Sequence, residues 1–143
     1  MKKYCIAAYA IASTILFLSQ PILADDACIV IGFHEPNSQT YDGPTYCSSV
    51  TIKNIIVRGP LHTDHAVMLG TTQVDGPLFS KSTLFNTIQI KSPFSQMKVR
   101  LQDHTIDKHN LIFEGASGLY HVDHSSNIEG KVINGNPMNK APV

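Results

Sequence analysis

Hydrophobic and polar residues alternate in many short stretches of this chain. The alternation in VTIKNIIV and in TIQI is typical of strands with one buried face. Proline and glycine interrupt the sequence too often for long helices. The pattern therefore predicts an all-β fold whose strands lie in the short apolar runs CIVIGF (28–33), VTIKNIIV (50–57), AVML (66–69), NTIQI (86–90), VRLQ (99–102), NLIF (110–113) and KVI (131–133).

A turn signal recurs along the chain at nearly constant intervals of 16, 17 and 16 residues. It consists of the pairs Gly43-Pro44, Gly59-Pro60, Gly76-Pro77 and Ser92-Pro93. Two residues before each pair stand Tyr41, Val57, Val74 and Ile90, and two after its first residue stand Thr45, Leu61, Leu78 and Phe94. Two further columns contain Ile55, Thr72 and Ile88, and Val67, Leu84 and Val99. Four columns at one period indicate a structural repeat.

A period of 16 to 17 residues fits one rung of a short single-stranded parallel β-helix, or β-solenoid. Successive rungs would lie about 4.8 Å apart, so each column would become a ladder of like side chains in a narrow core. Glycine would form the corner, and proline would stand where no ladder hydrogen bond is needed. The alternative is an antiparallel β-sandwich with turns every 8–12 residues. It explains the turns but not the matching columns. We expect the solenoid repeats to span residues 41–133.

The N-terminus has the layout of a secretory signal peptide over residues 1–24. Lys2 and Lys3 precede an apolar run from Cys5 to Leu18, and Ala24 stands at the expected cleavage point. The alternative is a retained membrane anchor, although the run is short for a span of about 20 residues. The signal predicts a bacterial periplasmic or secreted protein with no membrane association once the signal is removed.

Removing residues 1–24 changes the charge and the cysteine count. The whole chain has a formal net charge of +0, and without Lys2 and Lys3 it carries nine basic and eleven acidic residues. No basic stripe remains, which argues against nucleic-acid binding. Cys28 and Cys47 become the remaining pair, so a disulfide between them is expected in an oxidising compartment. We therefore predict a disulfide-bearing N-terminal cap over residues 25–48 and a polar, flexible tail over residues 134–143.

The repeats resemble those of the bactofilins, a family of polymer-forming cytoskeletal proteins. The resemblance covers about residues 41–133 and rests on coil length and on Val/Ile-x-Gly steps. It implies a small β-helix that stacks end to end, and it carries over no active-site residues. Bactofilins are mostly cytoplasmic and lack a disulfide, so the resemblance bears on the fold more than on the function.

Histidine and aspartate gather in three short segments, HTDH (62–65), DHTIDKH (103–109) and HVDH (121–124). Imidazole and carboxylate groups are good zinc ligands. Residues three apart on a strand, however, point to opposite faces, and no recognised ligand spacing occurs. We therefore expect no metal or cofactor and interpret these residues as polar corners; the weak metal candidates are His62, His65, His104, His121 and His124.

No motif for nucleophilic catalysis is present, because no GxSxG elbow occurs. An acid–base pair would have to come from a sparse set of carboxylates: Asp64, Asp75, Asp103, Asp107, Glu114 and Asp123. We therefore expect a non-enzymatic protein; a small metal-dependent or polysaccharide-active enzyme is less favoured.

The leading functional hypothesis is an exported structural or protein-interaction solenoid that associates with itself through its ends or with another envelope or secreted protein. The alternative is an envelope module that binds glycan or another ligand on one solenoid face. The aromatic residues look dispersed in the sequence, which favours the first hypothesis.

Overall fold

The computed structural model describes residues 28–92 and 97–138, and these form short strands with no helix. Sheet A contains seven strands: β1 (Ile29–Val30), β4 (Thr45–Ser48), β7 (Leu61–Asp64), β10 (Leu78–Lys81), β13 (Lys98–Gln102), β16 (Gly118–Val122) and β19 (Gly135–Pro137). Sheet B also contains seven: β2 (Phe33–His34), β3 (Thr40–Asp42), β6 (Ile55–Arg58), β9 (Thr71–Val74), β12 (Thr87–Ser92), β15 (Leu111–Gly115) and β18 (Val132–Ile133). Sheet C contains five: β5 (Thr51–Ile52), β8 (Val67–Met68), β11 (Leu84–Phe85), β14 (Ile106–Asp107) and β17 (Asn127–Ile128).

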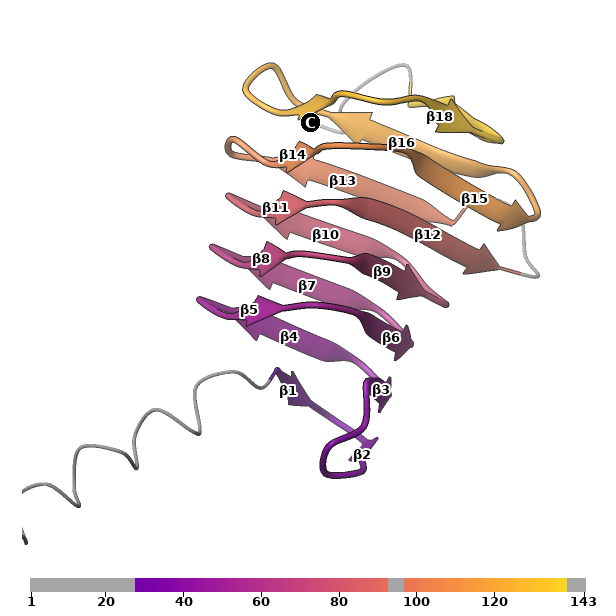
Figure 1. Cartoon of the computed structure of the whole chain (residues 1–143). Helices are drawn as coiled ribbons and strands as arrows, with labels where there is room; N and C mark the ends of the chain where they lie inside the picture. The colour runs from indigo at the N-terminus through magenta and orange to yellow at the C-terminus, as the bar shows by residue number, and fades with distance from the viewer. Residues whose placement is uncertain (1–27, 93–96, 139–143) are drawn as a thin grey trace, which may run out of the picture.

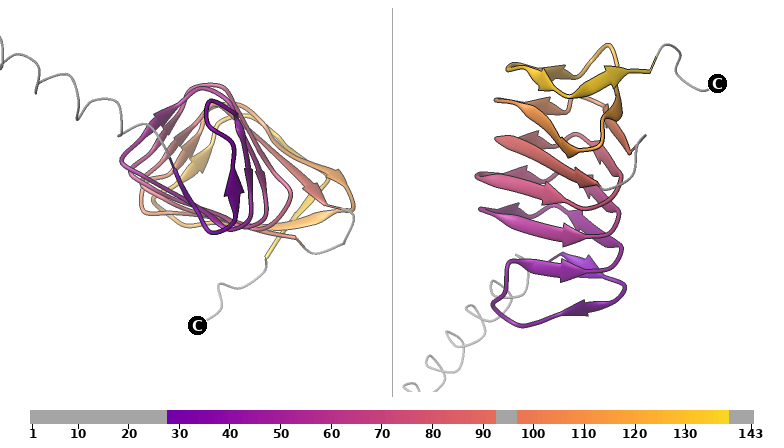
Figure 2. Two further views of the ribbon diagram at one scale, coloured as in Figure 1. Left: turned by 90° about the horizontal axis from the view of Figure 1, so that it is seen from below. Right: turned by 90° about the vertical axis from the view of Figure 1, so that its right-hand side faces the viewer.

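From β3 to β19, the spatial neighbour of each strand is the strand three places later in the sequence. The chain therefore passes from sheet to sheet in turn and forms a coil of about five rungs (Figure 1). Seen along the axis, the rungs superpose around a narrow interior (Figure 2). The predicted parallel β-solenoid is confirmed, and the antiparallel sandwich is wrong. Among the described residues, no helix is long and apolar enough to cross a membrane.

The strand registers reproduce most of the predicted columns. Tyr41, Val57, Val74 and Ile90 lie opposite one another in sheet B, as do Ile55, Thr72 and Ile88. Thr45, Leu61 and Leu78 lie in register in sheet A. All ten side chains are buried. Each column is thus a ladder in the core, as the periodicity predicted.

The predicted period is wrong beyond Ile90. Val99 lies opposite Leu78, 21 residues away, whereas Leu84 lies opposite Ile106. The later rungs are longer because β12 continues to Ser92, opposite Gly115, and the chain then needs further residues to reach β13. Ser92 therefore ends a strand instead of forming a fourth Gly-Pro corner, and Pro93 and Phe94 lie outside the described residues.

The Gly-Pro corners stack backbone against backbone. A Cβ atom on Gly59 would lie 2.8 Å from the carbonyl carbon of Gly43, and one on Gly76 would lie 2.6 Å from the carbonyl oxygen of Gly59. No side chain fits between rungs at this distance. The carbonyl oxygens of Pro60 and Pro77 accept hydrogen bonds of 2.9 Å from the N–H groups of Thr45 and Leu61 one rung earlier. The phrase recurs because every early rung turns the same corner.

An antiparallel cap covers two sides of the N-terminal end. β1 pairs with β4 and β2 pairs with β3, both antiparallel, and a disulfide joins Cys28 to Cys47 in the first rung. Tyr41, Cys47 and Val50 beneath this cap are at most 6% exposed. At the other end, the tail predicted from residue 134 contains β19, so its first part is ordered. The predicted signal segment lies outside the described residues.

A charge introduced at Val74, in the buried column of sheet B, should destabilise the fold. Val74→Asp should lower the free energy of unfolding by about 4 kcal/mol or more, because Val74 is 0% exposed and its ladder neighbours offer no partner for a carboxylate. Gln73→Asp is the control, since residue 73 is next in the strand and only half-buried. Urea unfolding measures both, and equal midpoints would contradict the column assignment.

Candidate functional site

Within the described residues, the histidines singled out in the sequence do not form a metal-binding group. His62 lies in β7 and His121 in β16, three strands away across sheet A. His65 and His104 occupy corners with positive φ, of 54° and 67°, and His65 Nδ1 lies 2.7 Å from Asp64 Oδ1. His124 is exposed beyond β16. Among residues 28–92 and 97–138, no three His, Cys, Asp or Glu side chains are close enough to hold a metal ion.

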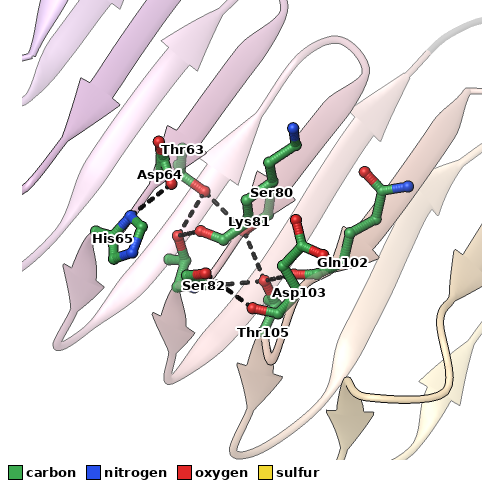
Figure 3. A network of polar contacts seen from close by, with 10 residues as sticks. Thr63, Asp64, His65, Ser80, Lys81, Ser82, Gln102, Asp103 and Thr105 are labelled. Atoms are coloured by element: carbon green, nitrogen blue, oxygen red, sulfur yellow. Dashed lines mark hydrogen bonds and ion pairs between the residues drawn. The ribbon is translucent and has the colours of Figure 1, made fainter.

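Four buried hydroxyl groups form a network inside the corner between sheets A and C (Figure 3). Thr63 donates to Ser80 over 2.7 Å, Thr83 donates to Thr63 over 3.0 Å, and Ser80 lies 3.4 Å from Thr105. Thr105 also donates to the carbonyl oxygen of Gln102. These partners are hydroxyl and backbone groups, none of which is a general base. The network therefore satisfies buried polar atoms and stabilises the corner.

Asp107 interrupts an otherwise apolar inward column of sheet C. It lies between Phe85 and Ile128 in register and is 0% exposed. Its Oδ1 accepts a 3.4 Å hydrogen bond from the N–H of His109, whereas its Oδ2 has no partner. Burial raises the pKa of Asp107 to about 7, despite the opposing effects of the His109 N–H and imidazole. The carboxyl group is therefore neutral below about pH 7.

The pKa of Asp123, at the corner that follows β16, is shifted in the opposite direction. Burial favours its neutral form, but hydrogen bonds from the Asp103 N–H, from Ser126 and from the Ser125 hydroxyl and N–H together lower its pKa to about 2. This carboxylate organises a turn. Since Asp107 faces the core and Asp123 a surface corner, they do not face a common cleft as an acid–base pair would.

The outer face of sheet A carries an apolar column that the sequence analysis missed. Ile29, Tyr46, His62 and Phe79 lie opposite one another on β1, β4, β7 and β10. The ring centroids of Tyr46 and His62 are 4.9 Å apart, and those of His62 and Phe79 are 5.0 Å apart. Two of the aromatic residues that look dispersed in the sequence, Tyr46 and Phe79, therefore lie in one line with His62 between them. Each ring directly follows Thr45, Leu61 or Leu78, so extending that repeat column by one residue would have found the line.

A shallow groove of about 280 Å³ runs beside this outer column. Its other border is a polar row, two residues further along each strand, formed by Ser48, Asp64, Lys81 and Gln102. The ring planes of the stacked pairs are 16° and 25° apart, so both faces of His62 are stacked, as is one face each of Tyr46 and Phe79. The groove thus joins an apolar strip to a row of hydrogen-bonding groups.

In the part of the chain that the structure describes, the core is open at the C-terminal end. Tyr120, Val122, Ile128 and Val132 face inward above Val99, Leu101, Asp107 and Leu111, which are all 0% exposed. The upper four are only partly buried, because at most one further strand, β19, lies above them. In addition, β17, β18 and β19 are the last strands of their sheets within residues 28–92 and 97–138. Unpaired backbone groups and apolar side chains are therefore exposed together.

The exposed apolar residues of the N-terminal cap have a different orientation. Ile29 and Phe33 are 71% and 63% exposed. Ile29 lies opposite Tyr46 and Phe33 opposite Asp42, so both point outward from the side of the coil. They extend the lateral surface and do not leave the core open.

A scan against protein-family models finds no match, and searches of curated proteins and of solved structures find no significant match either. The resemblance to bactofilins therefore stays a prediction from the repeat pattern.

Asp107 predicts a pH dependence of stability. The unfolded chain releases this proton near pH 3.8, whereas the folded chain keeps it to about pH 7. This carboxyl group therefore makes stability fall as pH rises from about 4 to about 7, by at most about 1.4 kcal/mol per pH unit, and leaves it constant above. Asp107→Asn should gain stability relative to the native chain between pH 5 and pH 8 in urea unfolding. Exposed Asp75→Asn should not, and parallel pH profiles for Asp107→Asn and the native chain would contradict the assignment.

Proposed function

We propose that this chain is a non-enzymatic β-solenoid with a structural or protein-interaction role, and that it associates with another protein chain through its C-terminal end. The observation that carries the proposal is the difference between the two ends. Within the described residues, the core is covered on two of its three sides at the N-terminal end, where Tyr41, Cys47 and Val50 are buried. It is open at the C-terminal end, where Tyr120, Val122, Ile128 and Val132 are partly exposed.

Two physical reasons favour a protein partner for the open end. Burial of a partly exposed apolar side chain is favourable by about 25 cal/mol per Å² of apolar surface removed from water. The edge strands β17, β18 and β19 offer free N–H and C=O groups, which another chain can satisfy by adding strands. Ile133 on β18 is 44% exposed and adds apolar surface to the same edge.

The proposed location is the periplasm or the extracellular space. Support comes from the signal-like residues 1–24 and from the pairing of Cys28 with Cys47, which suits an oxidising compartment. The non-enzymatic role is supported by the chemistry of the described residues. Their buried hydroxyls form hydrogen bonds with one another and with backbone groups. Asp107 is buried in the core, and Asp123 accepts hydrogen bonds within a turn.

Site-specific crosslinking tests the proposed surface. A photo-crosslinking residue at position 133 should form a covalent adduct with one defined protein in cells that produce the chain, identified by mass spectrometry. The same residue at position 69 should not, because Leu69 is 54% exposed but lies on the side of the coil after β8. Adducts at neither position, or equal adducts at both, would contradict association through the C-terminal end.

The alternative function is binding of an envelope glycan or another ligand on the outer face of sheet A. The line of Tyr46, His62 and Phe79 beside the polar row favours it, because sugars present both apolar C–H and hydroxyl groups. It ranks second because stacking within the line takes up both faces of His62 and one face each of Tyr46 and Phe79, which leaves few ring faces for a sugar.

This alternative makes its own prediction. If the groove binds glycan, Phe79→Ala should weaken binding of soluble cell-wall glycan fragments at least about tenfold, which corresponds to about 1.4 kcal/mol of lost contact. Ile112→Ala should leave binding unchanged, because Ile112 lies in sheet B. Titration calorimetry measures both variants. Absence of binding by the native chain, or equal loss in both variants, would exclude this function.

A further inference from the structure

We propose that the partner of the C-terminal end is a second copy of this chain, and that the two copies form a closed twofold dimer, tail to tail. This inference rests on the proposed function, because it requires the C-terminal end to be the interaction surface. It adds the identity of the partner and the symmetry of the complex.

A second copy matches this end in both of its exposed features. Each copy presents three edge strands and four partly exposed apolar side chains, namely Tyr120, Val122, Ile128 and Val132. Facing ends would pair backbone with backbone and place apolar surface on apolar surface. An isologous contact of this kind needs no second type of surface and closes at two subunits.

Head-to-tail stacking of two copies would cover less of the exposed core than tail-to-tail contact. The N-terminal end already buries Tyr41, Cys47 and Val50 beneath β1 and β2. Ile29 and Phe33, although exposed, point sideways. Head-to-tail contact would therefore cover one open core per interface, whereas tail-to-tail contact covers two.

The helical rise of the coil selects the position of the twofold axis. The chain climbs from β17 through β18 to β19, and one full turn rises by about 4.8 Å. The last three strands therefore lie at increasing heights along the coil axis. The ends of two copies are complementary when the strand that extends furthest in one copy faces the strand that extends least in the other. This places β19 opposite β17 of the second copy and β18 opposite its own symmetry mate, antiparallel.

The residues of β18 suit this arrangement. In an antiparallel pair, residues directly opposite one another share a face, so Ile133 faces its symmetry mate outside while Val132 stays inside. Lys131 precedes the strand and is displaced from its own mate, which avoids contact between like charges. Ile133 is then an exposed apolar residue that the dimer covers.

Light scattering of the chain purified from cells that export it tests the dimer. The native mass should rise with concentration from one to two subunits and stop there. Ile133→Lys should weaken dimerisation at least about tenfold, because it places two like charges opposite each other. Leu69→Lys is the matched control, since it adds the same charge at an equally apolar, exposed position away from the end, and it should dimerise like the native chain.

A second variant protects the test against misfolding of Ile133→Lys. Ile133→Cys should form an intermolecular disulfide on mild oxidation, whereas Leu69→Cys should not. A mass that grows beyond two subunits, or equal weakening by both lysine variants, would overturn the closed dimer. A native monomer at all concentrations, together with a crosslink from position 133 to a different protein, would overturn the second copy and leave the proposed function intact. A monomer with no crosslink would overturn both.

Discussion

The stacking of parallel rungs at the spacing of one strand is the constraint on which the rest of this structure depends. At about 4.8 Å, every residue lies directly against its counterpart in the next rung. A position that must be glycine in one rung must therefore be glycine in the next, as Gly43, Gly59 and Gly76 show by the contact of their backbones. The same constraint places Val57, Val74 and Ile90 on one another in the core.

A fold that repeats has no intrinsic end, so each terminus needs its own solution. At the N-terminus the chain reverses direction, adds two antiparallel strands and ties them to the first rung through Cys28 and Cys47. At the C-terminus the described chain adds β19 on one side and leaves the outer edges of β17 and β18 without a partner strand. The proposed function rests on this difference between the two ends.

The interior also tolerates polar groups where the ladder can satisfy them. Thr63, Ser80 and Thr105 come from successive rungs and reach one another because stacking brings their hydroxyls within hydrogen-bond range. Asp107 has no such neighbour, and its free Oδ2 atom is accommodated by keeping the carboxyl group protonated below about pH 7. It lies one layer beneath the open end, in register with Ile128, so the least satisfied part of the core is next to the proposed interface.

The sequence alone determined the period, the Gly-Pro corners and the buried columns up to Ile90, because stacking repeats the same local demand in each rung and leaves a visible pattern. The disulfide followed from the cysteine count, because removing residues 1–24 leaves Cys28 and Cys47 as one pair. Only the tertiary structure decided the later register, since the longer rungs beyond β12 have no repeated corner to mark them and place Val99 on Leu78. It also revealed the line of Tyr46, His62 and Phe79, whose residue types differ and become equivalent only once strands are paired. The burial of Asp107 and the openness of the C-terminal core depend on what lies above each residue, which is a property of the stacked rungs and not of any one segment.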